Sequence, residues 1–263
     1  MKIFLVVLFF MLQAFIVQAA TFNHSDWDML LKKHVVAVSG SQATRINYAG
    51  VAANSVQFEK YLTELSSVKR VEFDSWTKHQ QLAFLINAYN AWTVELVLSA
   101  YPDIESIKDI GSVFSSPWSK EFFSLLDETR SLDNVEHDLI RGSGRYNEPR
   151  IHFAVNCASI GCPALRAEAY VAERLDTQLE DATRRFLSNR NQNRFEDDTL
   201  KVSSIFKWYR KDFKQGWRGL KTLNDFFAYY HQELKLNQNH IDRLKSESID
   251  IEFLSYDWKL NKL

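Results

Sequence analysis

One segment, Thr77–Ala100, constrains the fold more than any other, because its apolar residues recur with the 3.6-residue period of an α-helix. Thr77 followed by Gln80 is typical of a capping box at a helix start. At the other end, a residue that precedes proline, here Tyr101, disfavours helical backbone. We therefore expect a long helix with one face in the core, formed by Leu82, Leu85, Ile86, Tyr89, Thr93, Leu96 and Val97.

Further periodic segments predict a mostly helical α+β domain around a small β-sheet. Glycine and proline are scarce, eight and four in the whole chain, which argues against a sandwich of many short strands because that architecture needs many turns. Asn189–Asp198 is expected to be a polar connection. The other expected helices are Val171–Ser188 and Thr222–Leu236, with weaker patterns at Ser25–Val38 and Ser55–Leu65, and the expected strands are Ile151–Val155, Thr199–Val202 and Phe122–Leu126.

The first residues predict a secretory signal peptide. Lys2 precedes an apolar run over Ile3–Leu12, and Val17-Gln18-Ala19 offers small residues for cleavage after Ala19. The run is short for a membrane span of about 20 residues, so we expect no stable membrane anchor after cleavage. Residues 20–263 would then form one domain in the periplasm or outside the cell.

The charge of that processed chain bears on its partners. With Lys2 removed, Lys and Arg fall from 32 to 31 against 33 Asp and Glu, which is a net charge of −2. There is no basic excess for binding a phosphate backbone, so nucleic acid is not an expected partner. A small molecule or peptide is expected instead.

Both cysteines lie in RIHFAVNCASIGCP, residues 150–163. In the expected strand, Ile151, Phe153 and Val155 alternate with His152 and Ala154. Asn156 and Cys157 end the strand, and a helix turn starting there would lower the pKa of the thiol. A nearby imidazole would activate the sulfur further.

These residues leave other interpretations open. A Cys157–Cys162 disulfide could close the loop in an oxidising compartment, or Cys157 could be a buried free thiol. A metal site is a third possibility, because zinc accepts Cys, His and Glu ligands, although the spacing matches no established pattern. Its ligands would be Glu136, His137, His152, Cys157 and Cys162.

Glu136 and His137 also have an ordinary structural interpretation. In SLDNVEHDLIRG, residues 131–142, Asp133 followed by Glu136 is a second candidate capping box. His137 would then be a half-exposed helix residue.

Five blocks of the sequence occur in this order: AFLINAYNAW (83–92), LDNVEHDLIR (132–141), RIHFAVNCASIGCPAL (150–165), VSSIFKWYRKDF (202–213) and YDWKLN (256–261). Together they resemble the DUF547 family, a domain of unknown function, with a family core at about residues 70–261. The resemblance implies that His152 and Cys157 belong to the family's H-F-A-x-x-C block and Glu136-His137 to its E-H block. A relation to cysteine-peptidase or transglutaminase-like folds is a further expectation.

Two classes of function follow. The first is an exported thiol enzyme of acyl or amide chemistry on peptide- or glutathione-like substrates, needing no cofactor or metal. Cys157 would be its nucleophile, His152 or His137 the base and Glu136 or an Asn the orienting group. The alternative is a non-catalytic binding module with a disulfide-closed loop and an aromatic surface of Trp118, Trp208, Tyr209 and Trp217. The supporting positions are Asn87, Asn90, Asn156, Cys162 and Asp212. The amides are expected to tie down the cysteine turn or to orient an imidazole. Asp212 is expected to act similarly or to pair with Arg210 or Lys211.

Overall fold

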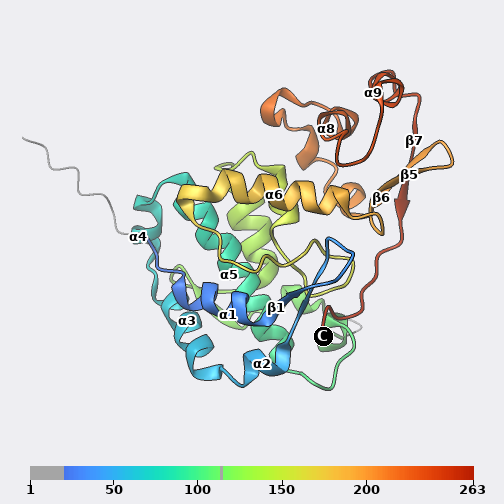
Figure 1. The fold of residues 1–263 in the computed structure, drawn as a ribbon. Coiled ribbons are helices and arrows are strands. Elements are labelled where there is room, and N and C mark those ends of the chain that lie inside the picture. The colour runs from blue at the N-terminus through green and yellow to red at the C-terminus, as the bar shows by residue number, and fades with distance from the viewer. Residues whose placement is uncertain (1–20, 113–114) are drawn as a thin grey trace, which may run out of the picture.

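The computed structural model describes residues 21–112 and 115–263, and it is built around helix α5, Lys78–Leu98 (Figure 1). The predicted capping box is present: Thr77 Oγ1 accepts from the Gln80 N–H, and Gln80 Oε1 accepts from the Thr77 N–H at 2.8 Å. Almost every residue from Gln81 to Val97 is buried, so the helix is enclosed on all sides rather than along one face. The predicted buried central helix is confirmed.

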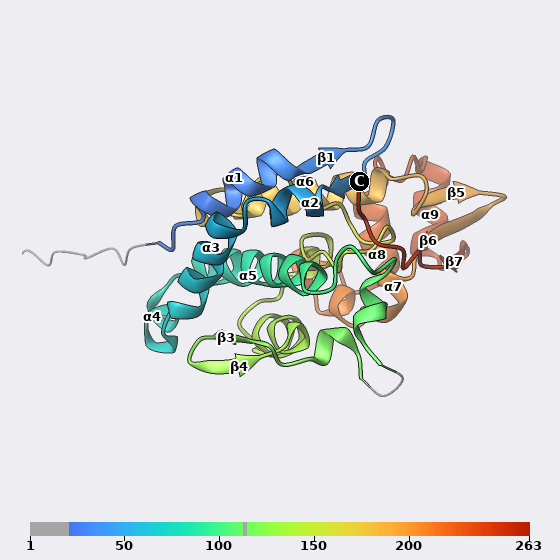
Figure 2. The same cartoon turned by 90° about the horizontal axis from the view of Figure 1, so that it is seen from below.

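Shorter helices pack around α5. In Figure 2, α1, α2 and α6 lie on one side of α5, and the β3–β4 hairpin lies on the other. Helices α3 and α4 connect these two sides at one end. The bounds are α1 Ser25–His34, α2 Tyr48–Ala52, α3 Ser55–Ser67, α4 Arg70–Ser75 and α6 Leu175–Ser188.

In the described part of the chain the strands form three small sheets, which together with the helices make this a mixed α+β structure. Two are antiparallel hairpins, β1–β2 and β3–β4, and in the third, β6 pairs antiparallel with β5 and parallel with β7. The parallel pair needs a long crossover, which here contains α7 (Ile205–Trp208), α8 (Leu223–Tyr229) and α9 (Gln238–Lys245). The strands are β1 Val35–Ala37, β2 Thr44–Ile46, β3 Phe123–Leu125, β4 Glu128–Arg130, β5 Arg194–Glu196, β6 Thr199–Ser203 and β7 Asp250–Leu254.

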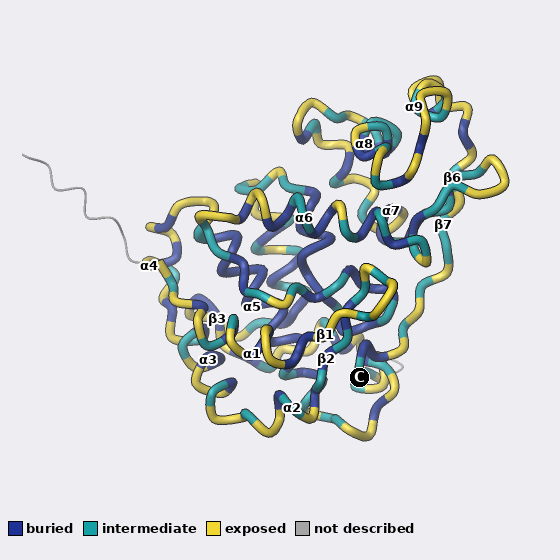
Figure 3. Tube along the Cα trace, viewed as in Figure 1, coloured by how far each residue is buried: buried dark blue, intermediate teal, exposed yellow. Residues whose placement is uncertain are grey.

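Two hydrophobic cores result. The first surrounds α5, and the second joins the end of α6 to β6, α7 and α8 through Phe186, Phe206 and Phe226. Figure 3 shows the buried trace concentrated at α5 and around α6, while α9 and the tip of the β5–β6 hairpin are largely exposed. The segment that carries the cysteines runs between these cores, since Phe153 belongs to the second and Val155 to the first.

The predicted strand Ile151–Val155 is wrong. Residues Pro149–Phe153 form a 3-10 helix, η4, in which Pro149 stands at the first turn and the Glu148 side chain accepts from the Arg150 N–H. Proline presets the backbone for that position because its φ is fixed near the helical value. The expected alternation of faces is also absent, because every residue from Pro149 to Asn156 is buried.

Other boundaries shift by a few residues. The helix expected at Val171–Ser188 begins at Leu175 after a short 3-10 turn, and the one expected at Thr222–Leu236 ends at Tyr229. Ser25–Val38 divides into α1 and strand β1, since β-branched Val35 and Val36 pair with β2. The connection Asn189–Asp198 contains β5. The strands expected near Thr199–Val202 and Phe122–Leu126 are confirmed as β6 and β3.

In residues 21–112 and 115–263, no helix is both long and apolar enough to cross a membrane. The predicted signal peptide and its cleavage after Ala19 lie outside the described residues.

Candidate functional site

A pocket of about 180 Å³ opens between the two hydrophobic cores, with Val155 of the first core and Ile205 of the second in its wall. Four residues predicted for the catalytic site line this pocket, namely Glu136, His137, His152 and Cys157, together with Cys162. Asp133 and Pro163 also contribute. The rest of the wall is mainly aromatic and consists of Tyr89, Trp118, Trp208, Tyr209, Tyr256 and Trp258.

The two cysteines form a disulfide in the wall of this pocket, with their Cα atoms 6.1 Å apart. Cys162 is only 6% exposed, whereas Cys157 is partly exposed. The Tyr256 hydroxyl lies 3.0 Å from Cys157 Sγ and 3.1 Å from Cys162 Sγ. Burial, and then the charge of Glu136, raise the pKa of Tyr256, so this hydroxyl keeps its proton and donates it to sulfur.

Buried amides hold the cysteine loop from α5 and from within. Asn90 Nδ2 donates to the Ala154 carbonyl at 2.9 Å, and Asn90 Oδ1 accepts from the Asn156 N–H at 2.8 Å. Asn156 in turn donates to the Pro163 carbonyl and accepts from the Ala158 N–H. Asn90 therefore ties down the cysteine turn, which is one of the two roles expected for it from the sequence, although that turn follows η4 rather than a strand. Cys157 lies in a loop and not at the helix N-terminus expected for it.

The C-terminal segment fixes the other side of the loop. The N–H groups of Ile160 and Gly161 donate to the carbonyls of Lys259 and Asp257, both at 2.8 Å. Gly161 is needed here because a Cβ atom would lie 3.0 Å from the Tyr256 ring. This pairing brings Tyr256 against the disulfide.

His152 is the imidazole best placed to act as a base. Its Nε2 lies 2.7 Å from Asp212 Oδ2, and its ring stacks on Tyr209 with centroids 3.9 Å apart. Burial lowers the pKa of His152, and the Asp212 hydrogen bond opposes this only in part. The ring is therefore neutral near pH 7, with its proton on Nε2 toward the carboxylate. Its other nitrogen, Nδ1, is buried and has no hydrogen-bond partner among the described residues.

Asp212 is a carboxylate shared by two partners. Besides His152, it pairs with Arg141, whose Nε lies 2.6 Å from Asp212 Oδ2. Although burial works against it, these hydrogen bonds hold the pKa of Asp212 well below its usual range. The alternative of a surface pair with Arg210 or Lys211 is not what the structure shows.

His137 is less suited to proton transfer. Its Nδ1 lies 2.7 Å from an Arg141 guanidinium nitrogen, which can only donate, so the imidazole lone pair is already used. Its side chain is 41% exposed, which agrees with the half-exposed position expected from the sequence.

The capping box expected between Asp133 and Glu136 is wrong, because Glu136 has no capping role. The reciprocal cap forms two residues earlier, between Ser131 and Asn134, at the start of π-helix η3, Asn134–Arg141. Glu136 is only 5% exposed, and its Oε1 makes no hydrogen bond with any described residue. Its charge adds to burial in raising the pKa of Tyr89 and of Tyr209.

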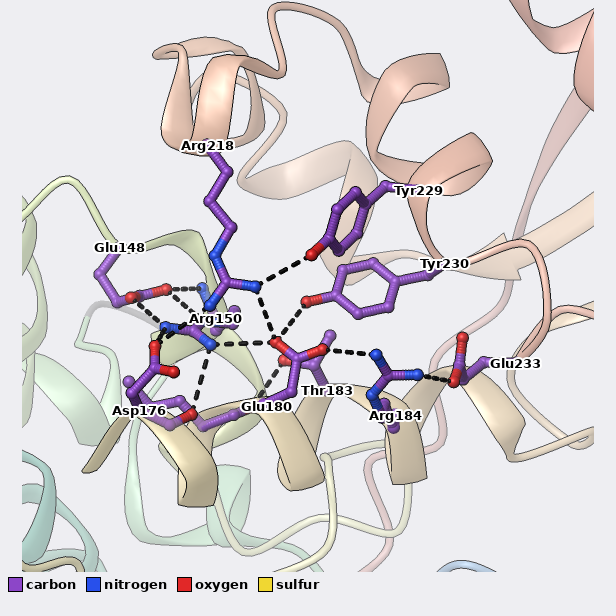
Figure 4. Close-up of polar contacts among 11 residues, drawn as sticks. Glu148, Arg150, Asp176, Glu180, Thr183, Arg184, Arg218, Tyr229, Tyr230 and Glu233 are labelled. Atoms are coloured by element: carbon purple, nitrogen blue, oxygen red, sulfur yellow. Dashed lines mark hydrogen bonds and ion pairs between the residues drawn. The ribbon is translucent and has the colours of Figure 1, made fainter. Parts of the chain in front are cut away.

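Helix η4 is anchored by a buried ion cluster (Figure 4). Arg150, two residues before His152, has a side chain that is 3% exposed. Its guanidinium pairs with Glu148 at 2.7 Å, Asp176 at 2.6 Å and Glu180 at 3.0 Å. This cluster joins η4 to α6.

Trp217 belongs to this cluster and not to the pocket, contrary to the expected aromatic surface. Its ring is flanked by the guanidinium groups of Arg150 and Arg218, 4.8 and 4.5 Å from the ring centroid. Asn87 also lies elsewhere than expected: it bonds both backbone groups of Tyr170, away from the cysteine loop. Trp118, Trp208 and Tyr209 do line the pocket.

Three aromatic residues of the pocket were not predicted as site residues from the sequence, namely Tyr89, Tyr256 and Trp258. Tyr256 and Trp258 fall in the block YDWKLN, and the resemblance of this block to the family was the only sequence feature that pointed to these two residues. Lys108 Nζ lies 3.6 Å from the centroid of the Trp258 ring, but Lys108 does not line the pocket.

No set of three or more His, Cys, Asp or Glu side chains in the described part of the chain is arranged to hold a metal ion. Both cysteine sulfurs are bonded to each other.

Comparison with known proteins gives one match. Residues 73–187 match the family model described as "Protein of unknown function, DUF547". The matched range contains Asn90, Glu136, His152 and Cys157 and ends before Asp212 and Tyr256. No curated protein and no solved structure matches the chain, so a relation to cysteine-peptidase or transglutaminase-like folds is not supported.

Proposed function

We propose that this chain, which belongs to the DUF547 family, is an exported thiol-dependent enzyme of acyl or amide chemistry with Cys157 as nucleophile and His152 as general base. The observation that carries the proposal is the shared pocket: the partly exposed sulfur and a buried, neutral imidazole with a free lone pair both line it. Asp212 orients that imidazole through Nε2. A nucleophile, a base and an orienting carboxylate are the parts that such chemistry requires.

The disulfide is the resting form in this proposal. An external dithiol reduces it by two electrons and two protons, leaving thiols at Cys157 and Cys162 and an oxidised dithiol. Cys157 is the reacting thiol because it is the more exposed of the two. The Tyr256 hydroxyl then supports its thiolate, since a hydrogen bond to the charged form favours ionisation.

Acyl transfer follows in two balanced steps. Cys157 Sγ attacks the substrate carbonyl carbon while its proton passes to His152 Nδ1, and the imidazolium then protonates the departing amine or alkoxide. The product of this half is a thioester. Water attacks the thioester with His152 as base, releasing the acid and restoring the thiol.

A simple activated ester tests this mechanism. Reduced protein mixed with p-nitrophenyl acetate should release one burst of p-nitrophenolate per chain and carry an acetyl group on Cys157, seen by peptide mass spectrometry. Cys157→Ser should abolish both, and Cys162→Ser should retain both. If the reduced wild-type protein shows no burst above that of a small thiol, the chain is better explained as the binding module, with the disulfide closing its loop.

Export is part of the same proposal, because a disulfide persists in oxidising compartments. Expressed in a bacterium, the full chain should be recovered from the periplasm or the medium. N-terminal sequencing should then begin at Ala20. Recovery only in the membrane pellet with Met1 retained would contradict it.

A further inference from the structure

The pocket combines buried negative charge with an aromatic wall. Glu136 and Asp133 line it, and none of the described residues that line it is Lys or Arg. Glu136 is 5% exposed, and its Oε1 has no hydrogen-bond partner among the described residues, although it lies 4.0 Å from His137 Nδ1. A buried charge without a counter-charge is costly, so this is a position where a ligand can add stability.

Arg141 forms its ion pair with Asp212 and not with Glu136. Arg141 feels the charge of Glu136, but its guanidinium makes two hydrogen bonds to the Asp212 carboxylate and a third to His137. Arg141 and Asp212 thus form a pair of balanced charge, and both line a separate small cavity. Among the described residues, no Lys or Arg forms an ion pair with Glu136, and the imidazole nitrogen closest to it, His137 Nδ1, already accepts from Arg141.

The aromatic wall favours the same kind of ligand. Trp208, Tyr256 and Trp258 pack against one another, with ring centroids between 4.5 and 5.8 Å apart. Indole and phenol rings attract cations over their faces, because the ring face is the negative side of the quadrupole. Together with the buried Glu136 carboxylate, such rings select an ammonium group over a neutral group of the same shape.

We infer that the pocket binds a protonated amine, so that the substrate carries an ammonium group close to the carbonyl that Cys157 attacks. An α-amino group or an amine-bearing side chain of a peptide has this chemistry. Glu136 acts here as a positioning residue for the ligand, while Asp212 orients the base. The inference rests on the proposed function only in calling the ligand a substrate.

Calorimetric titration of the oxidised protein tests the inference without the thiol. The probes are benzylammonium chloride and benzyl alcohol at pH 7. Wild type should bind the cation about tenfold or more tighter than the alcohol, because a charge-assisted contact is favoured in a shielded site. Glu136→Gln, which keeps the shape, should reduce this preference to about twofold or less. Asp138→Asn is the matched control, since Asp138 is exposed on the same helix η3 and does not line the pocket.

The outcomes test the cation-site inference and the thiol-enzyme proposal separately. Equal affinity of wild type for the two probes, or no binding of either, overturns the inference even if Glu136→Gln fails to fold. A preference that survives Glu136→Gln in a folded protein overturns the role of Glu136. A protein that acetylates Cys157 but does not discriminate the probes loses only this inference. One that discriminates without acetylation keeps the cation site and loses the thiol-enzyme proposal.

Discussion

At the residue scale, two buried asparagines of α5 show how similar side chains do different work. Asn87 and Asn90 each satisfy one backbone donor and one backbone acceptor across the core. Amides are poor helix formers, so their presence in a buried helix indicates a task outside that helix. Only Asn90 contacts the segment that leads into Cys157, and this distinction depends on the three-dimensional path of the chain.

Replacing each amide separates structure from function. Asn90→Ala and Asn87→Ala should each lower the free energy of unfolding by about 2–4 kcal/mol, because two buried backbone groups lose their partners. Asn90→Ala should also slow alkylation of reduced Cys157, whereas Asn87→Ala should not. Denaturant unfolding and iodoacetamide labelling measure the two effects. Equal labelling rates in the two variants would remove Asn90 from the account of the site.

At the element scale, the sequence predicted long periodic helices better than the short segment that carries the site. Helix α5 was recognisable because Thr77, Gln80 and an apolar period agree. Helix η4 was not, because Ile151, Phe153 and Val155 alternate as in a strand while tertiary contacts bury every position. Pro149 and Glu148 were the local signals for a helical turn. The role of Asp212 depends on Arg141 and His152, which are distant in sequence, so spacing alone could not assign it.

The ion cluster of Figure 4 should determine whether η4 stays in place. Arg150→Met should destabilise the protein by about 3–5 kcal/mol, because it removes a buried guanidinium and leaves the Glu148 carboxylate, which is 14% exposed, without its ion-pair partner. Arg184→Met is the control: its side chain is 46% exposed and pairs with Glu180 and Glu233, so its loss should cost less than about 1 kcal/mol. Thermal and urea unfolding compare the two. Similar small losses for both variants would show that the Arg150 cluster is not an anchor.

At the scale of the whole molecule, the pocket lies where two hydrophobic cores meet and the C-terminal segment returns to the cysteine loop. Glu136, His137, His152 and Cys157 could be proposed from sequence because they fall in recognisable blocks. Tyr256 reaches the disulfide because the C-terminal segment pairs with the cysteine loop, Ile160 with Lys259 and Gly161 with Asp257. Such long-range pairing has no local sequence signature, which is why the aromatic part of the pocket was only partly foreseen.

Buried neutral histidines should make stability fall with acid. Burial lowers the pKa of His24 from 6.5 to about 3. The unfolded chain therefore binds a proton that the folded chain excludes, and the free energy of unfolding falls as the pH drops from about 6.5 toward 3, by up to about 1.4 kcal/mol per pH unit. His24→Gln should flatten the dependence of melting temperature on pH in this window. His79→Gln, at an exposed position, should leave the dependence unchanged; a slope equal in both variants and wild type would contradict the prediction.

The pH dependence of Cys157 alkylation in the reduced protein tests the central claim most directly. With Cys162→Ser as background, the iodoacetamide rate should exceed that of a small thiol at pH 7 and have a midpoint below the ordinary thiol value of about 8.5. Tyr256→Phe should raise this midpoint, and His152→Gln should slow the reaction, with circular dichroism confirming that both variants are folded. A midpoint near 8.5 and an ordinary rate, unaffected by either change, would show that Cys157 is not an activated nucleophile and that its disulfide only closes the loop.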